Sequence, residues 1–206
     1  MADVNLHFTL AWELCRWQCA MVRAIFFCSF LLACWLWMQI VHEAGHVVGA
    51  WLSGGTVKQV VLHPLTISRT EVEGSTQPLI VIWSGPIVGC IAPLLLWCLA
   101  AAGKWPSAFV FRFFAGFCLI VNGAYLAAGS FDGIGDCGDL LRHGAPIWTL
   151  WLFGAITLPS GLLLWHRQGE HFGMGPAPKL VSRQLAYSSA AFALVTIIAE
   201  LIWSAI

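Results

Sequence analysis

Two histidines and a glutamate stand close together in the stretch His42-Glu43-Ala44-Gly45-His46. Because side chains four residues apart share one face of a helix, both imidazoles would project in the same direction. Two such imidazoles begin a zinc site, and the glutamate beside the first one reaches a water bound to the ion rather than the ion itself. The stretch therefore predicts one zinc ion per chain, bound by His42 and His46, with Glu43 as general base.

The surroundings of this stretch favour chemistry over a chance match. It lies in a long apolar run that begins near Ala24 and ends near Leu52. Ionisable groups inside a membrane-spanning helix are costly and are by default functional. The sequence therefore predicts a metal site at membrane depth.

A catalytic zinc ion has three protein ligands and one open position, so a third ligand is needed. The extended pattern His-Glu-x-x-His-x-x-Gly-x-x-His fails at its last position, which is Leu52. The third ligand must come from elsewhere in the chain. The acidic residues considered for it are Glu71, Glu73, Glu170, Glu200 and the three aspartates of the polar island Asp132, Asp136 and Asp139.

The composition indicates a membrane protein. Of the 206 residues, 59% are hydrophobic and only 10% are charged, against about 25% charged residues in soluble domains. The 12 tryptophans agree with this, because indole rings favour the membrane–water interface. The formal net charge is 0 and no basic patch is present, so nucleic-acid binding is excluded.

Five apolar segments are long enough, or nearly so, to cross a bilayer as helices. We expect an all-α multi-pass membrane protein of about five transmembrane helices, with a single metalloprotease-like domain over residues 24–206 and an interfacial segment over residues 1–23. The lipid bilayer is then the first partner of the chain. The five segments run from about 24 to 52, 78 to 102, 107 to 128, 146 to 165, and 187 to 206.

Two further features belong to this plan. Residues 56–74 alternate polar and apolar positions between Gly54-Gly55 and Gly74-Ser75, which predicts a small β-hairpin after the first span. Six lysines and arginines lie on the side of the N-terminus and three on the other side, so the positive-inside rule predicts a cytoplasmic N-terminus.

Taken together, these residues resemble the site-2 protease class of intramembrane zinc metalloproteases, of which this chain would be a short and divergent member. The histidine–glutamate motif in a spanning helix carries most of the likeness. The hairpin, the element Ser84-Gly85-Pro86 and the stretch from Asn122 to Asp136 add to it. The resemblance covers roughly residues 24–165.

The usual pattern of that class, Asn-x-x-Pro followed by Leu-Asp-Gly-Gly, is not present as such. Asn122 is followed by Gly-Ala-Tyr, and Phe131-Asp132-Gly133 comes ten residues later. The stretch Gly135-Asp136-Cys137-Gly138 resembles a divergent branch in which an aspartate opens a helix. The resemblance therefore implies Asp136 as third ligand, with Asp132 as the alternative. Asn122 would contact the substrate backbone or the developing oxyanion, or else form a hydrogen bond between helices.

The function implied by the resemblance is hydrolysis of peptide bonds in membrane-embedded or membrane-proximal protein substrates. The alternative is a metal-binding membrane protein of the same fold without proteolytic activity, such as a scaffold or a metal-handling factor. The presence of Glu43 favours the protease, since a purely structural site has no need of a base.

Overall fold

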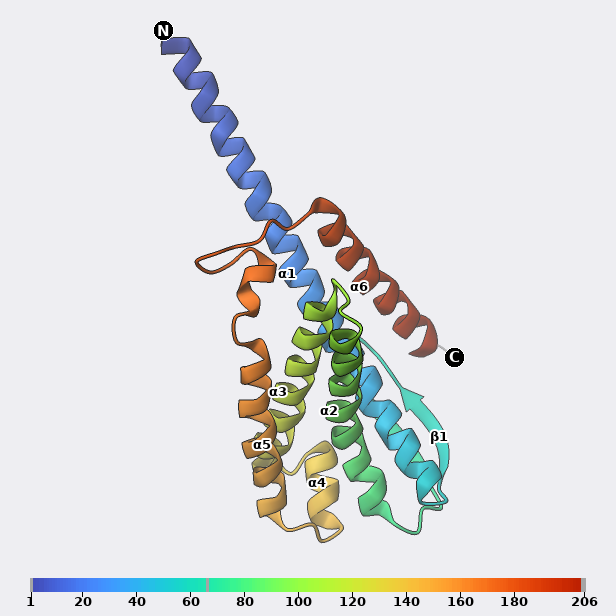
Figure 1. Ribbon diagram of the computed structural model, residues 1–206. Coiled ribbons are helices and arrows are strands. Elements are labelled where there is room, and N and C mark those ends of the chain that lie inside the picture. The colour runs from blue at the N-terminus through green and yellow to red at the C-terminus, as the bar shows by residue number, and fades with distance from the viewer. Residues whose placement is uncertain (1, 66, 205–206) are drawn as a thin grey trace. The chain divides into compact units, whose positions relative to one another are not determined.

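The computed structural model describes the backbone of residues 2–65 and 67–204 and the side chains of residues 16–65 and 67–204. Almost all regular structure in these ranges is helical (Figure 1). The elements in chain order are α1 (Ala2–Leu52), β1 (Thr56–Val61), β2 (Arg69–Glu73), α2 (Pro78–Ala102), α3 (Ala108–Asp132), α4 (Gly135–Arg142), α5 (Ile147–Trp165), the short 3-10 helix η1 (Gln168–Phe172) and α6 (Arg183–Ser204).

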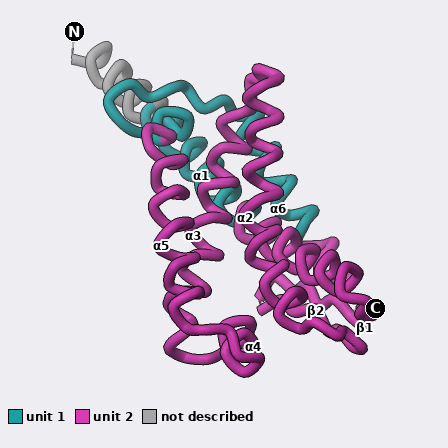
Figure 2. Tube along the Cα trace, turned by 60° about the horizontal axis from the view of Figure 1, so that its bottom comes forward, with its two compact units in different colours: residues 1–33, 169–196 teal, residues 34–168, 197–206 magenta. Residues whose placement is uncertain are grey.

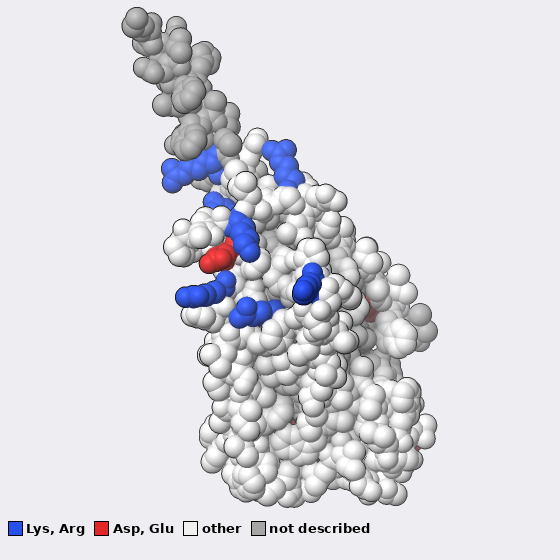
Figure 3. Space-filling view, in the orientation of Figure 1, with Lys and Arg blue, Asp and Glu red and all other residues white. Residues whose placement is uncertain are grey.

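Five of the described helices are long and apolar enough to span a membrane, so the predicted multi-pass helical architecture is confirmed, and the chain is an integral membrane protein. The second span, Pro78–Ala102, has the predicted bounds. In the region of the first span, helix α1 begins well before Ala24, the expected start, because no glycine or proline precedes Gly45 to interrupt it. On the face shown in Figure 3, broad areas carry no charged side chain, as a lipid-facing surface requires.

The chain forms two compact units (Figure 2). The first comprises residues 1–33 and 169–196, and the second comprises residues 34–168 and 197–206. Within the first unit, Arg23 donates a hydrogen bond to the carbonyl of Gly173 (2.9 Å), and the ring of Phe26 stacks on that of Phe172. The side chains of residues 1–15 lie outside the described part, so the interfacial position of residues 1–23 stays a prediction, as does the orientation of the N-terminus.

Within the second unit, α3 packs between α2 and α5 (Figure 1). Small residues allow the close approach of α3 and α5: a Cβ added to Gly161 would lie 2.7 Å from the carbonyl oxygen of Gly116, and one added to Gly154 would lie 2.6 Å from Ala127. Small residues at helix contacts are the usual means of packing in membranes, where no hydrophobic effect drives helices together.

The predicted hairpin is confirmed. Strands β1 and β2 pair antiparallel, with Val57 opposite Val72, and Lys58 lies at an irregularity of the register. Along β2 the exposure alternates, so that Thr70 and Val72 are half-buried while the intervening side chains are exposed. Since β1 occupies one edge of β2, the other edge of β2 has no strand partner among the described residues.

The polar island between the third and fourth spans contains the short helix α4, which begins at Gly135 and has Asp136 in its first turn. Helix α3 continues through Asp132 and ends where Gly133 adopts a left-handed conformation (φ 63°). This tight turn leaves Asp132 on the end of one helix and puts Asp136 in the first turn of the next.

Candidate metal centre

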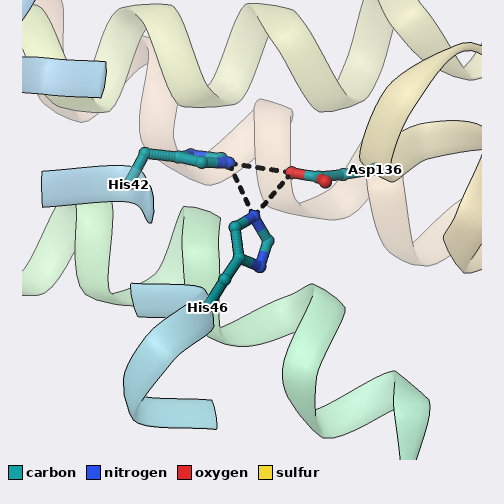
Figure 4. A group of neighbouring side chains, drawn as sticks. All are labelled: His42, His46 and Asp136. Carbon is teal, nitrogen blue, oxygen red and sulfur yellow. Dashed lines mark hydrogen bonds and ion pairs between the residues drawn. The ribbon is translucent and has the colours of Figure 1, made fainter. Parts of the chain in front are cut away.

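His42 and His46 project from the same face of α1, and both side chains are buried. Their ring centroids lie 4.9 Å apart, and the Nε2 atoms face each other at 3.1 Å (Figure 4). No side chain interrupts this pair, because the residues between them, apart from Glu43, are alanine and glycine. The helical spacing is therefore sufficient to bring two nitrogen donors together.

Asp136 reaches the same point from the first turn of α4 (Figure 4). Its Oδ2 lies 2.8 Å from His42 Nε2 and 3.3 Å from His46 Nε2. Among the described residues, these three side chains form the one group of histidines, cysteines and acids close enough to share a metal ion.

The outward nitrogens of the two imidazoles are held by acceptors. His46 Nδ1 lies 2.9 Å from the carbonyl oxygen of Val81 on α2, which can only accept. His42 Nδ1 lies 2.7 Å from Asn122 Oδ1, and Asn122 Nδ2 donates to the carbonyl of Cys118 at 2.9 Å, which fixes the orientation of the amide. Both Nδ1 atoms therefore carry protons, and each neutral imidazole presents a lone pair at Nε2.

Two lone pairs and a carboxylate oxygen thus converge, and they require a cation between them. A proton bridges only one of the three pairs at a time, whereas one metal ion serves all three. Ligand atoms of a tetrahedral zinc ion, each about 2.0–2.1 Å from the metal, lie about 3.3 Å from one another. The observed separations of 2.8, 3.1 and 3.3 Å come close to that geometry. The donor set fits zinc.

The electrostatics of Asp136 agree with a ligand role. Burial alone raises the pKa of this carboxyl, but its close contacts with the imidazoles of His42 and His46 lower it by more, and the net pKa lies well below the usual range. The carboxylate is therefore ionised at neutral pH, so an anionic donor faces the two imidazoles.

Glycines bring α2 against the face of α1 that carries His42 and His46. A Cβ added to Gly45 would lie 2.8 Å from the Cα of Gly85, and one added to Gly85 would collide with the imidazole of His46. A Cβ at Gly89 would lie 3.1 Å from the amide of Asn122. The element Ser84-Gly85-Pro86 noted in the sequence is thus the place where the two helix backbones approach.

Glu43 is buried, with 3% of its surface exposed, and its carboxylate turns toward the hairpin rather than into the group of three. The hydroxyl of Thr70 on β2 donates to Glu43 Oε2 at 2.7 Å. This contact was not foreseen, because Thr70 and Glu43 lie 27 residues apart and nothing in the sequence of a strand marks one threonine among its neighbours. The hairpin therefore fixes the position of the expected base.

The other acidic candidates lie elsewhere. Asp132 is exposed at the end of α3, and Glu71 and Glu73 are on the exposed face of β2. Glu170 belongs to η1 in the other compact unit. Glu200 is buried in α6, and neither of its carboxylate oxygens has a hydrogen-bond partner among the described residues. None of these five residues belongs to the group around His42.

Asn122 is 1% exposed, and both ends of its amide are engaged, one with His42 and one with its own helix. These contacts orient the imidazole of His42, as outer partners of metal ligands commonly do. A contact of Asn122 with substrate or oxyanion stays a prediction.

A cavity of about 1030 Å³ opens beside the three side chains. Helix α1, strand β2, the start of α2, the middle of α3 and the start of α4 all contribute to its wall, and Glu43 and Asp136 both line it. It is large enough for a short stretch of extended polypeptide.

The sequence model of the Peptidase M50B-like family matches residues 17–127, more than half of the chain. The matched range contains His42, Glu43, His46 and Asn122 and ends before α4. No curated protein matches the chain, and no solved structure does.

Proposed function

Because the chain belongs to the Peptidase M50B-like family and is thereby related to the site-2 proteases, we propose that it is an intramembrane zinc metalloprotease. Its substrates are membrane-embedded or membrane-proximal segments of other proteins. One observation carries the proposal: three metal-binding atoms converge from α1 and α4, with the carboxylate of Glu43 beside them on the same cavity.

His42, His46 and Asp136 are the residues that would hold the zinc ion, one per chain. When bound, zinc supplies a Lewis acid that acidifies a water molecule and polarises the scissile carbonyl. Glu43 accepts the proton of the attacking water and passes it to the departing amine. Asn122 and the carbonyl of Val81 keep the two imidazoles in the tautomer that leaves Nε2 free for the metal.

The cavity and the hairpin suggest how a substrate is held. A helix hides its backbone in its own hydrogen bonds, so the segment to be cleaved must be unwound. Thr70 and Val72 line the cavity from β2, and Ile67 lines it from the segment just before that strand. The outer edge of β2 has no strand partner in the described part of the chain. An extended substrate segment would pair with this edge by backbone hydrogen bonds.

Removal of the metal tests the function. We expect the purified protein, reconstituted in liposomes with model single-span membrane proteins, to contain one zinc ion and to cleave within or next to the span. Dialysis against a chelator should abolish cleavage, and added zinc should restore it. Stoichiometric zinc without cleavage of any of these proteins would instead favour the alternative, a metal-binding membrane protein without proteolytic activity.

The contact between Thr70 and Glu43 leads to a second prediction. Thr70→Val should lower kcat roughly tenfold to a hundredfold, because a hydrogen bond to a charged group contributes about 1.5–3 kcal/mol. KM should change little, since the hydroxyl is directed at Glu43.

Thr70→Ser is the matched control, because it restores the hydroxyl without the methyl group and should recover most of the activity. If Thr70→Ser and Thr70→Val lowered kcat equally, the methyl group of Thr70 rather than its hydrogen bond to Glu43 would be the important feature.

A further inference from the structure

Tyr125 of α3 contacts the beginning of α4, the short helix that carries Asp136. Its hydroxyl oxygen accepts a hydrogen bond from the backbone N–H of Asp136 at 3.0 Å. The N–H groups in the first turn of a helix have no acceptor within the helix. Ile134 at the N-cap provides none either, since it makes no side-chain capping bond. The tyrosine on a neighbouring helix supplies the missing acceptor.

Two neighbours of Asp136 are also adapted to this tyrosine. The thiol of Cys137 donates to the carbonyl oxygen of Tyr125 at 3.2 Å. Gly135 adopts a left-handed conformation (φ 58°), and a Cβ at this position would collide with the tyrosine hydroxyl. Residues 135, 136 and 137 are thus all held against Tyr125.

The same side chain contacts a second member of the candidate metal site. The ring of Tyr125 meets the imidazole of His42 edge to face, with centroids 6.1 Å apart. Tyr125 therefore touches His42 through its ring and Asp136 through its hydroxyl, although it carries no metal-binding atom of the group. Tyr125 also lies three residues after Asn122, at the position where the Asn-x-x-Pro pattern of the site-2 protease class has proline.

We propose that Tyr125 is a positioning residue that sets the third zinc ligand, by fixing the first turn of α4 so that the Asp136 carboxylate meets the two imidazoles. This inference rests on the proposed zinc site. Asp136 is the only ligand of the three that does not come from α1, so its distance from the histidines depends on how α4 is held. Without the hydroxyl, the half-buried N–H of Asp136 would lose its acceptor, and the first turn would shift to find another.

The test is the zinc affinity of Tyr125→Phe, measured by competition with a chromophoric chelator. We expect binding about 10–100-fold weaker than in the wild type, the usual cost of losing an outer-shell partner of a metal ligand. Tyr187→Phe is the matched control, because Tyr187 is the only other tyrosine of the chain and is exposed on α6. The control should bind zinc like the wild type.

Thermal unfolding separates positioning from a general loss of stability. Tyr125→Phe should unfold near the wild-type temperature without metal and gain less from added zinc. An affinity equal to that of the wild type would overturn the role of Tyr125 while leaving the zinc protease intact. Absence of zinc from the wild type itself would instead overturn the proposed function.

Gly135→Ala is a second variant that keeps the tyrosine. Its Cβ should displace the hydroxyl and weaken zinc binding, and the effect should be smaller in the Tyr125→Phe background, where the hydroxyl is gone. Part of the cost, the strain of alanine at positive φ, would remain in both backgrounds. Equal effects of Gly135→Ala in the two backgrounds, or normal zinc affinity of the folded single variant, would contradict the proposal.

Discussion

Glu43→Gln is expected to retain one zinc ion and to lose about 10²–10⁴-fold in kcat, the usual contribution of a general base. The amide has nearly the shape of the carboxylate, and its oxygen can still accept the hydrogen bond from Thr70. It cannot take a proton from water at neutral pH. Because Glu43 is buried, this neutral replacement also leaves no unpaired charge inside the protein.

The measurement is zinc content and cleavage rate in the same preparation. Glu71→Gln is a suitable control, since Glu71 lies on the exposed face of β2. This replacement should change neither the zinc content nor the cleavage rate. Unchanged cleavage with zinc retained would show that Glu43 is not the base. Loss of zinc together with activity would show that Glu43 supports the metal site itself.

Asp136→Ala is expected to weaken zinc binding by more than about 100-fold, because it removes a ligand, and even the loss of an outer-shell partner costs about 10–100-fold. Cleavage should fall to background. Two imidazoles would remain, 3.1 Å apart at Nε2, without an anionic donor. Zinc should accordingly stabilise the variant against heat much less than it stabilises the wild type.

Asp132→Ala is the matched control, because it makes the same chemical change four residues away at the exposed end of α3. It should bind zinc and cleave substrate like the wild type. The reverse result, zinc lost from Asp132→Ala and kept by Asp136→Ala, would mean that α3 rather than α4 supplies the third ligand. Equal retention by both variants would point to a ligand outside this region.

The sequence alone was sufficient where the relevant geometry is local. Two histidines four residues apart share a helix face whatever else the chain does. An apolar run of about 20 residues must be helical to satisfy its backbone in lipid. The alternation of polar and apolar residues over positions 56–74 is a local pattern, and this pattern is enough to indicate a hairpin. The spans, the hairpin and the placement of His42 and His46 follow from such rules.

The tertiary structure decided what depends on distant parts of the chain. Asp132 and Asp136 have similar surroundings in the sequence, and the left-handed turn at Gly133 separates them: one ends α3, and the other is carried by α4 to the imidazoles. The sequence around Thr70 and Tyr125 does not mark either residue as functional. Their hydroxyls form hydrogen bonds with Glu43 and Asp136, and these contacts exist only in the folded chain. Helical spacing places the two histidines proposed as ligands. The packing of α3, α4 and the hairpin places the proposed third ligand and orients the proposed base.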